Sequence, residues 1–294
     1  MNRFKALPAS IRGPIWMTLA CLSFSGMAVL VKELAKDIPP LEIGFFRALG
    51  GLLFMVPYAL RVGKAIWETE NHKVYAARGC TASIFVICYF PGVALIEIAD
   101  AQALTFTTPL FGFLLALFFL GEKLSFQRGI ALLTGFLGAL VILRPHFDLI
   151  NIGAFLILIS AVSAAASGTL LKFSTRKDAP DKIVFYHGLY ITPLVFLSAL
   201  PEWRWPTLEQ LLVLILIAAL ATLNQRCLSR SFAAADATAV LPFLFMRLPF
   251  GALLGFLAFG DIPDYWIWVG GIIIFCSSLY LTRVEVRGDK AGTT

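Results

Sequence analysis

Ten apolar stretches follow one another along the chain with short connections between them, and this succession limits the fold more than any other feature. A helix needs about 20 mostly apolar residues to cross a bilayer. Turn-forming Pro and Gly residues separate the stretches. We place the predicted spans at residues 14–35, 39–60, 75–96, 100–120, 127–143, 151–173, 181–200, 207–229, 235–259 and 265–282. The pattern predicts an all-α membrane protein of ten transmembrane helices in one bundle, without a separate soluble domain.

The composition argues against soluble enzymes and nucleic-acid binders. Hydrophobic residues make up 59% of the 294 residues and charged residues 14%, whereas a soluble domain is roughly 45–50% apolar and about 25% charged. The net charge of +6 comes from basic residues at the ends of apolar runs, not on one amphipathic face. The five Cys lie in apolar runs without metal-ligand spacing. We expect a lipid bilayer and a small-molecule metabolite as partners, and no nucleic acid, metal or cofactor; the oligomeric state stays open and is compatible with a monomer.

The distribution of Lys and Arg predicts the orientation. With the N-terminus inside, fifteen of the 24 basic residues fall in inner segments and three in outer loops. Cytoplasmic loops of membrane proteins carry this excess. The basic segment 1–12 precedes an apolar stretch too long for a signal-peptide core, so we expect an uncleaved first span. The prediction is a multi-pass protein of the cytoplasmic (inner) membrane with both termini cytoplasmic.

The two halves of the chain resemble each other at an offset of 140 residues, which shortens slightly towards the end. Chance similarity between apolar sequences is the alternative, but several non-apolar matches occur in one order. The matches include Gly13 with Gly153, Ser23 with Ser163, Lys32 with Lys172, Pro40 with Pro180, Phe45-Phe46-Arg47 with Phe185-Tyr186-His187, and Gly121-Glu122 with Gly260-Asp261. We predict five-helix repeats at 14–144 and 151–283, flanked by cytoplasmic tails at 1–13 and 284–294. Because five is odd, the repeats must insert with opposite topology, as in alternating-access carriers.

Several motifs resemble the drug/metabolite transporter superfamily, specifically its EamA-type branch. They are Phe45-Phe46-Arg47, Ala99-Asp100-Ala101, Pro109-Leu110-Phe111, the run from Gly121-Glu122-Lys123-Leu124-Ser125 to Gly129, and Ala235-Asp236-Ala237-Thr238. The likeness covers nearly the whole chain and, within the family, is greatest to bacterial S-adenosylmethionine uptake carriers. The resemblance implies two EamA repeats around a central cavity, working without ATP hydrolysis. The second repeat departs from the first at Gly260-Asp261-Ile262-Pro263 and at His187, so the halves cannot make identical contacts.

Three ionisable side chains deep within predicted spans are the principal candidates for substrate binding, because a charge inside a membrane is costly and usually functional. Arg247 lies near the middle of its span between Pro242 and Pro249, where the helix could be broken. Alternatively, Arg247 ties helices together through free carbonyls. Arg47 could bind substrate, or pair with Glu42 or a carbonyl. His187, the repeat counterpart of Arg47, could titrate near neutral pH or be a hydrogen-bonded structural residue.

Polar and aromatic side chains within the spans complete the predicted substrate site. Gln102 and Thr105 share a helical face with Thr108, although such groups also join helices without binding substrate. The remaining candidates are Tyr89, Asn224 and Phe243.

The other charged residues of the spans are interpreted as structural. For Arg78, Arg226, Lys32 and Lys172, near span ends, snorkelling is the preferred interpretation. Glu122 is expected to cap a helix, and the Gly-containing fifth and tenth spans to pack together as scaffold.

These observations predict a secondary-active transporter that moves a small organic metabolite by alternating access. The deep charges are positive, which suits a carboxylate-bearing solute, with S-adenosylmethionine or a similar amino-acid-like molecule preferred. A riboflavin importer or an amino-acid exporter on the same scaffold is the alternative. A membrane-embedded enzyme is a remote alternative, because the sequence has no G-x-S-x-G, no HExxH and no mid-span Asp pair. A channel or a receptor is also disfavoured. Nothing in the sequence resembles a selectivity filter, and a receptor would not need an inverted repeat.

Overall fold

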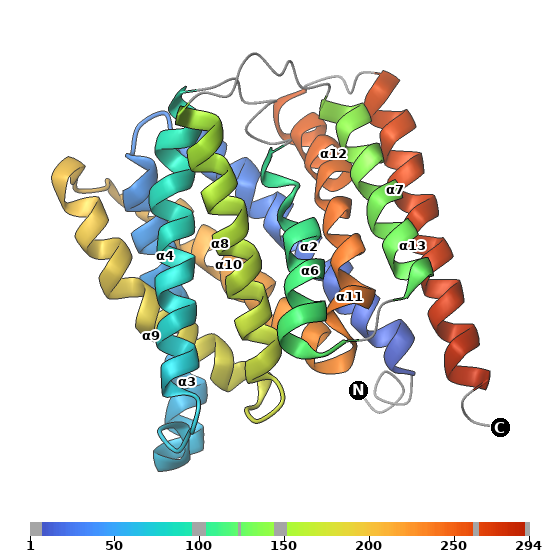
Figure 1. Cartoon of the computed structure of the whole chain (residues 1–294). Helices are drawn as coiled ribbons and strands as arrows, with labels where there is room; N and C mark the ends of the chain where they lie inside the picture. Colours follow the sequence, from blue (N-terminus) through green and yellow to red (C-terminus); the bar gives the residue numbers. More distant parts are fainter. Residues whose placement is uncertain (1–7, 96–103, 123–124, 144–151, 261–264, 292–294) are drawn as a thin grey trace.

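The computed structural model describes residues 8–95, 104–122, 125–143, 152–260 and 265–291, and all regular structure within these ranges is helical. Figure 1 shows the helices gathered into one bundle. The first half contains α2 (Ala9–Leu34), α3 (Pro40–Val62), η1 (Gly63–Ile66), α4 (His72–Leu95), α6 (Thr108–Leu120) and α7 (Phe126–Leu143). The second half contains α8 (Ile152–Ser174), α9 (Pro180–Ala199), η2 (Leu200–Glu202), α10 (Leu208–Ala234), α11 (Ala237–Val240), η3 (Leu241–Met246), α12 (Arg247–Phe259) and α13 (Tyr265–Ala291).

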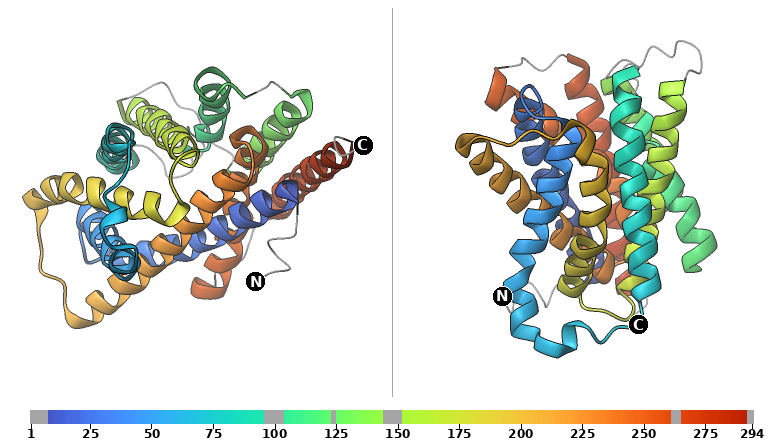
Figure 2. Two further views of the ribbon diagram at one scale, coloured as in Figure 1. Left: turned by 90° about the horizontal axis from the view of Figure 1, so that it is seen from below. Right: turned by 90° about the vertical axis from the view of Figure 1, so that its left-hand side faces the viewer.

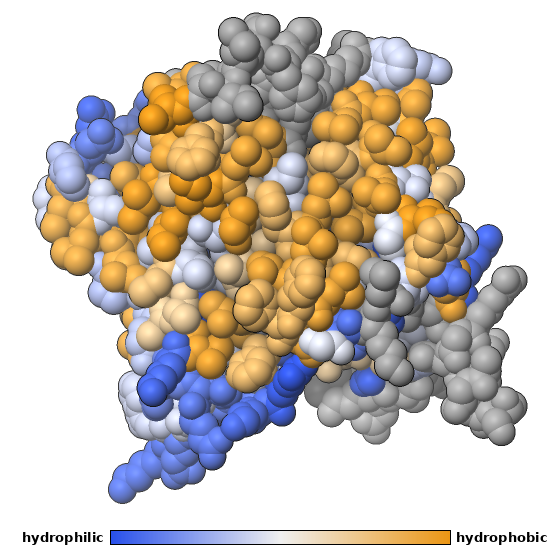
Figure 3. All heavy atoms as spheres, viewed as in Figure 1, coloured by the Kyte–Doolittle hydropathy of each residue, from blue (hydrophilic) through white to orange (hydrophobic). Residues whose placement is uncertain are grey.

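The bundle has the outer surface of a membrane protein. Seven helical stretches within the described ranges are long and apolar enough to cross a bilayer, and two shorter helices are also apolar. Large apolar side chains point outwards, among them Phe118 at 80% exposure. Orange, apolar atoms cover most of the face in Figure 3, and blue, polar atoms gather at its lower end. The surface therefore matches a multi-pass membrane protein, as its composition predicted.

Residues paired by the sequence repeat end and begin helices in the same way. Pro40 and Pro180 each occupy the first turn of a helix, where the missing N–H of proline costs nothing. Gly121 and Gly260 each end a helix in the left-handed conformation, with φ of 68° and 72°. The repeat therefore preserves the residues that fix helix boundaries.

Helices of one half pack mainly against helices of the other half. α2 packs against α10 and α12, whereas α8 packs against α4 and α6. α3 lies against α9 and α7 against α13. The long helices α2 and α10 run side by side across the bundle in Figure 2.

The predicted tight packing of the fifth and tenth spans is confirmed by α7 and α13. A Cβ atom added at Gly270 would lie 2.5 Å from the carbonyl oxygen of Gly138. Only glycine permits this approach of the two backbones.

The fourth predicted span is interrupted, which corrects one prediction. A turn at Phe106–Thr107 precedes α6. The hydroxyls of Thr107 and Thr108 donate to the carbonyls of Leu104 and Thr105 at 2.5 and 2.7 Å, and Pro109 lies in the first turn. Thr105 and Thr108 thus do not share the face of one continuous helix, and Gln102 lies outside the described residues.

The ninth span is broken, as the two prolines had suggested. Helix α11 passes into the 3-10 segment η3, which contains Pro242, and α12 begins at Arg247. Proline removes a backbone donor and prevents regular α-helical bonding around it. Arg247 therefore stands at a junction between two helical segments.

Candidate functional site

The structure brings Arg47 and His187 together in the centre of the bundle. Arg47 projects from α3 and His187 from α9, and both line a cavity of about 30 Å³. Thr222 and Gln225, one turn apart on α10, complete its polar lining. His187 is 8% exposed, and its Nδ1 atom has no hydrogen-bond partner among the described residues. The repeat thus places its two counterpart residues on opposite walls of one cavity.

Arg78 on α4 lies behind this cavity, and the interpretation that it snorkels is wrong. Its side chain is 2% exposed. Nη2 donates to Oε1 of Gln225 at 3.1 Å, Nη1 lies 3.5 Å from the carbonyl oxygen of Ile183, and Nε lacks a partner within the described part of the chain. Beside Arg78, α4 touches α9: a Cβ added at Gly79 would lie 2.7 Å from Cβ of Tyr190.

The guanidinium groups of Arg47 and Arg78 and the imidazole of His187 have no acidic partner in the described structure. Within the described ranges, no carboxylate forms an ion pair with Arg47, Arg78 or His187. Arg47 and Arg78 both lie close enough to His187 to act on it electrostatically. The alternative pairing of Arg47 with Glu42 is not found, because Oε2 of Glu42 accepts from the backbone N–H of Arg204 at 2.9 Å.

Arg247, the first residue of α12, packs against α2 and does not line the cavity that Arg47 and His187 share. Its guanidinium group stacks over the ring of Phe24, with Cζ 4.1 Å from the centroid, a cation–π contact. Ser25 donates to the backbone carbonyl of Arg247 at 3.0 Å. Nε of Arg247 has no hydrogen-bond partner among the residues described. The junction of η3 and α12 thus holds a half-buried guanidinium group whose Nε is available as a donor.

The remaining predicted site residues are dispersed. Nδ2 of Asn224 donates to the carbonyl of Ala20 at 2.7 Å, joining α10 to α2. Tyr89 stacks on Phe85 with centroids 5.4 Å apart. Phe243 in η3 lines a different cavity, of about 210 Å³, together with Arg128 and others. Among the predicted site residues, Arg47 and His187 thus share one cavity, Arg247 lies in a separate cluster, and Asn224 forms a contact between helices.

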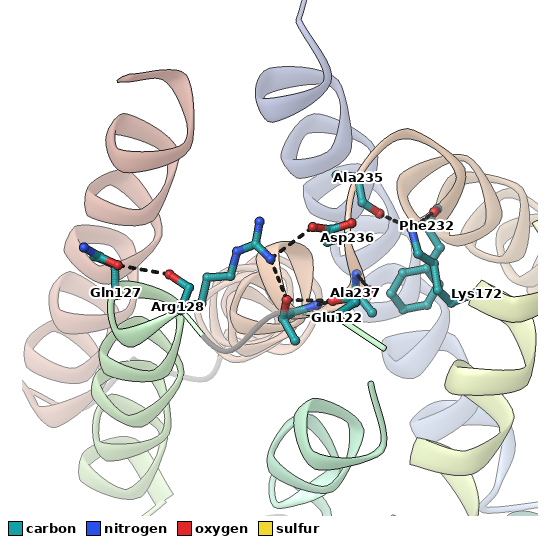
Figure 4. A network of polar contacts seen from close by, with 10 residues as sticks. Glu122, Gln127, Arg128, Lys172, Phe232, Ala235, Asp236 and Ala237 are labelled. Atoms are coloured by element: carbon teal, nitrogen blue, oxygen red, sulfur yellow. Dashed lines mark hydrogen bonds and ion pairs between the residues drawn. The ribbon is translucent and has the colours of Figure 1, made fainter. Parts of the chain in front are cut away.

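One end of the bundle carries a dense polar network that the sequence had only hinted at. We call it the polar end and define it by the connections at 63–71, 121–122, 175–179 and 235–236. Glu122 accepts from the backbone N–H groups of Ala237 and Thr238 at 2.7 and 2.9 Å. Arg128 pairs with Asp236 at 3.1 Å and donates to the Thr238 hydroxyl. Figure 4 shows these contacts between the α6–α7 turn and the start of α11.

Glu122 is a capping residue as predicted, but it caps a helix of the opposite half. The first N–H groups of α11, where the ninth span begins, have no intrahelical acceptor, and a carboxylate satisfies such groups well. Lys172 donates to the carbonyls of Phe232 and Ala235 at 2.8 and 2.6 Å, so it binds backbone instead of snorkelling. The sequence signal for the contact between Glu122 and α11 was the repeat, because both halves contain an Ala-Asp-Ala motif followed by Gly-Glu or Gly-Asp.

Asp178 joins the halves at a second point of the polar end. It accepts from Thr69, Asn71 and Tyr75 at 2.8, 2.6 and 2.7 Å and pairs with Lys182 at 3.2 Å. Burial acts to raise the pKa of Asp178, but hydrogen bonds from Asn71, Tyr75, Thr69 and Lys182 outweigh it and lower the pKa. Asp181 pairs with Arg226 and Arg230, both at 2.9 Å. The carboxylates of this region are therefore paired with cations or hydrogen-bonded to neighbouring groups.

Comparison with known proteins agrees with this fold. The EamA-like transporter family model matches residues 11–144 and 151–283. A riboflavin transporter of Rhizobium johnstonii is 32% identical over 96% of this chain and 94% of its own. An S-adenosylmethionine uptake transporter of Rickettsia bellii is 26% identical over 92% and 94%. The pseudopaline exporter CntI of Pseudomonas aeruginosa is 30% identical over 93% and 96%.

The fold itself also occurs among solved structures. One crystal structure, 17% identical in sequence, superposes with a TM-score of 0.82 over 94% of this chain and 98% of that chain. The likeness at this identity concerns the fold alone. With both of its halves matched by the family model and its helices arranged as a membrane bundle, the chain belongs to the EamA-like transporter family.

Proposed function

We propose that the protein is a secondary carrier of ten transmembrane helices, built as two inverted five-helix repeats, which works by alternating access. The observation that supports this proposal is the exchange of helix partners between the halves. The contacts of α2 with α10 and α12 correspond to those of α8 with α4 and α6, and the pairs α3–α9 and α7–α13 join counterparts. A pseudo-two-fold axis in the membrane plane would generate this pattern, and carriers bind substrate near such an axis.

The proposed substrate is a small carboxylate-bearing metabolite, with S-adenosylmethionine preferred. Arg47 and His187 lie near the proposed axis, and Arg247 lies at the break of the ninth span; all three would bind substrate. The support is that the guanidinium groups of Arg47 and Arg247 have no acidic partner in the described structure, because guanidinium groups bind carboxylates through parallel hydrogen bonds. S-adenosylmethionine also offers an adenine ring and a sulfonium, which aromatic side chains such as Phe243 could contact.

Riboflavin is the second candidate substrate, because a relative named riboflavin transporter is 32% identical to this chain. Riboflavin presents a flat ring and a hydroxylated chain, which would require aromatic and uncharged polar groups. The groups of this kind among the proposed site residues are the aromatic Tyr89 and Phe243 and the polar Gln102, Thr105 and Asn224; Asn224 has its Nδ2 engaged with a backbone carbonyl.

Uptake into proteoliposomes tests the proposed function. We expect labelled S-adenosylmethionine to accumulate and an excess of unlabelled compound to compete. Uptake of riboflavin without S-adenosylmethionine would select the second candidate, and transport of neither would refute both substrates.

The polar end is proposed to face the cytoplasm, with both termini on that side of the inner membrane. The excess of Lys and Arg in the segments 1–12, 61–73, 123–128 and 176–182 supports this orientation. A cysteine at Lys64, on the exposed segment η1, should resist a membrane-impermeant reagent added to intact cells. Labelling from outside would reverse the proposed orientation.

A further inference from the structure

We infer that Arg78, together with Arg47 and His187, forms a carboxylate-binding site at the junction of α3, α4, α9 and α10. The inference rests on the proposed function and adds Arg78 to the site. Its position near the end of a predicted span had assigned this residue to the bundle periphery. The inference also names the group of the substrate that the centre of the bundle recognises.

The first support is the unsatisfied hydrogen-bonding capacity of these buried groups. Nε of Arg78 and Nδ1 of His187 lack partners within the described structure, although the two side chains are 2% and 8% exposed. A buried donor or acceptor without a partner costs about 1–3 kcal/mol, and more for a charged group. A ligand that accepts hydrogen bonds here would remove that cost.

The second support is the charge balance around the cavity. Two guanidinium groups lie near His187, and the polar lining otherwise consists of the neutral residues Thr222 and Gln225. Glu42, a buried carboxylate five residues before Arg47, does not line the cavity; its Oε2 accepts from the backbone of Arg204, and its Oε1 has no partner among the described residues. Charges buried without a counter-ion are strongly unfavourable, so an anion is the expected occupant.

The third support is the size of the cavity. A volume of about 30 Å³ accommodates one or two water molecules or a planar group of three heavy atoms. A carboxylate fits these dimensions, whereas a metabolite pocket usually measures about 300–1,000 Å³. The cavity therefore holds one end of a substrate, and the remainder needs space that opens when the halves move.

Gln225 gives Arg78 a defined role in this site. The bond between Arg78 and Oε1 of Gln225 turns the guanidinium group towards the cavity that Gln225 lines. Arg78 stands behind Gln225 and does not itself line the cavity; Nη1 and Nη2 donate to Ile183 and Gln225, so its Nε, which lacks a partner among the described residues, is the donor that would reach a carboxylate beside Gln225. Arg78 is thus a specificity residue for the anionic end of the substrate.

The test compares two ligands that differ in the carboxylate alone, S-adenosylmethionine and its decarboxylated form, by calorimetric binding to purified protein. Wild-type protein should prefer S-adenosylmethionine by about tenfold or more. Arg78→Gln should reduce this preference to about one, and Arg78→Lys should retain part of it. Lys36→Gln, an exposed control paired only with Glu33 among the described residues, should keep the full preference.

The possible results separate the inference from the proposed function. If wild-type protein transports S-adenosylmethionine and Arg78→Gln keeps the full preference, the carboxylate site is refuted and the function stands. If S-adenosylmethionine does not bind but methionine is preferred over methioninamide and that preference requires Arg78, the site stands and the substrate is wrong. If no carboxylate is preferred in either pair, the inference fails. Should Arg78→Gln not fold, as judged by gel filtration, Arg47→Gln provides the same comparison from the opposite wall of the cavity.

Discussion

The polar end and the centre of the bundle each hold several cations, but their surroundings differ. At the polar end Arg128, Arg230 and Lys177 pair with Asp236, Asp181 and Glu70 at 2.6–3.1 Å. In the centre, Arg47, Arg78 and His187 have no acidic partner in the described part of the chain. Figure 4 shows one part of the polar end, where Glu122, Arg128 and Lys172 contact the residues around Asp236.

This difference separates charges that hold the structure from charges that are available to a ligand. A paired charge at a helix end contributes to stability and leaves few donors free. An unpaired buried cation raises the free energy of the folded state until an anion arrives. Substitutions should therefore affect stability at the polar end and substrate affinity in the centre.

The largest expected effect is the loss of transport in Arg247→Ala. Removing one charge-assisted contact costs about 1.5–3 kcal/mol, which corresponds to roughly a 10- to 150-fold loss of affinity. The free energy of unfolding should change little, because the side chain of Arg247 contacts the ring of Phe24 and the thiol of Cys21 and forms no ion pair among the described residues. Initial uptake rates in proteoliposomes and Tm measure the two effects, with Arg226→Ala as a comparison that should lower Tm and leave KM unchanged. Normal transport by Arg247→Ala would contradict the proposed role of this residue.

The second effect is the destabilisation of Glu122→Ala by roughly 3 kcal/mol. The substitution leaves the N–H groups of Ala237 and Thr238 without their acceptor and releases the start of α11 from the α6–α7 turn. Thermal unfolding in detergent measures the change. Glu33→Ala is the matched control, because its exposed pair with Lys36 contributes little. Equal Tm values for the two variants would mean that the polar end is not a stabilising network.

The third effect concerns close packing away from both regions. Gly270→Ala should destabilise the protein by about 2 kcal/mol, because the new Cβ would lie 2.5 Å from backbone of Gly138. Gly255→Ala provides a control in α12, since no atom lies within 4 Å of its added Cβ. This variant should be neutral or slightly stabilised, as alanine favours helix more than glycine does. Thermal unfolding distinguishes the two, and equal destabilisation would contradict the contact of α7 with α13.

The smallest effect is a pH dependence carried by Asp178. Its pKa is lowered in the folded protein, so the stabilisation is present above the ordinary Asp pKa and disappears as pH falls through the folded pKa. Asp178→Asn should cost about 1 kcal/mol at neutral pH and flatten the decline of Tm in acid. An unchanged acid profile in Asp178→Asn would assign the pH dependence to other carboxylates.

Much of the fold was predictable because it follows from local chemistry. Pro40, Pro180, Gly121 and Gly260 mark helix boundaries, and each acts where its backbone preference requires. The break of the ninth span follows from Pro242, whose ring excludes a regular helix. The break before α6 was missed, because hydroxyl-to-carbonyl bonds of Thr107 and Thr108 compete with the helix without interrupting its apolar character.

The candidate site was predictable only in part. Arg47 and His187 could be identified as a pair because the repeat aligns them. Arg78 was assigned to the periphery, since distance along a span gives no information about which way a side chain turns. Its side chain reaches the carbonyl of Ile183 on α9 and the amide of Gln225 on α10, and no local sequence pattern specifies contacts with those distant helices.

The sequence by itself determined the helical membrane architecture, the repeat and the family resemblance, because apolar length and turn residues act over a few residues of chain. The tertiary structure decided which charges are paired. Glu122 meets Ala237 and Asp178 meets Thr69 across more than 100 residues of chain, and Arg78 meets Gln225 across 147. Such contacts depend on how helices from opposite halves pack, and that packing distinguishes a stabilising charge from one that can receive a substrate.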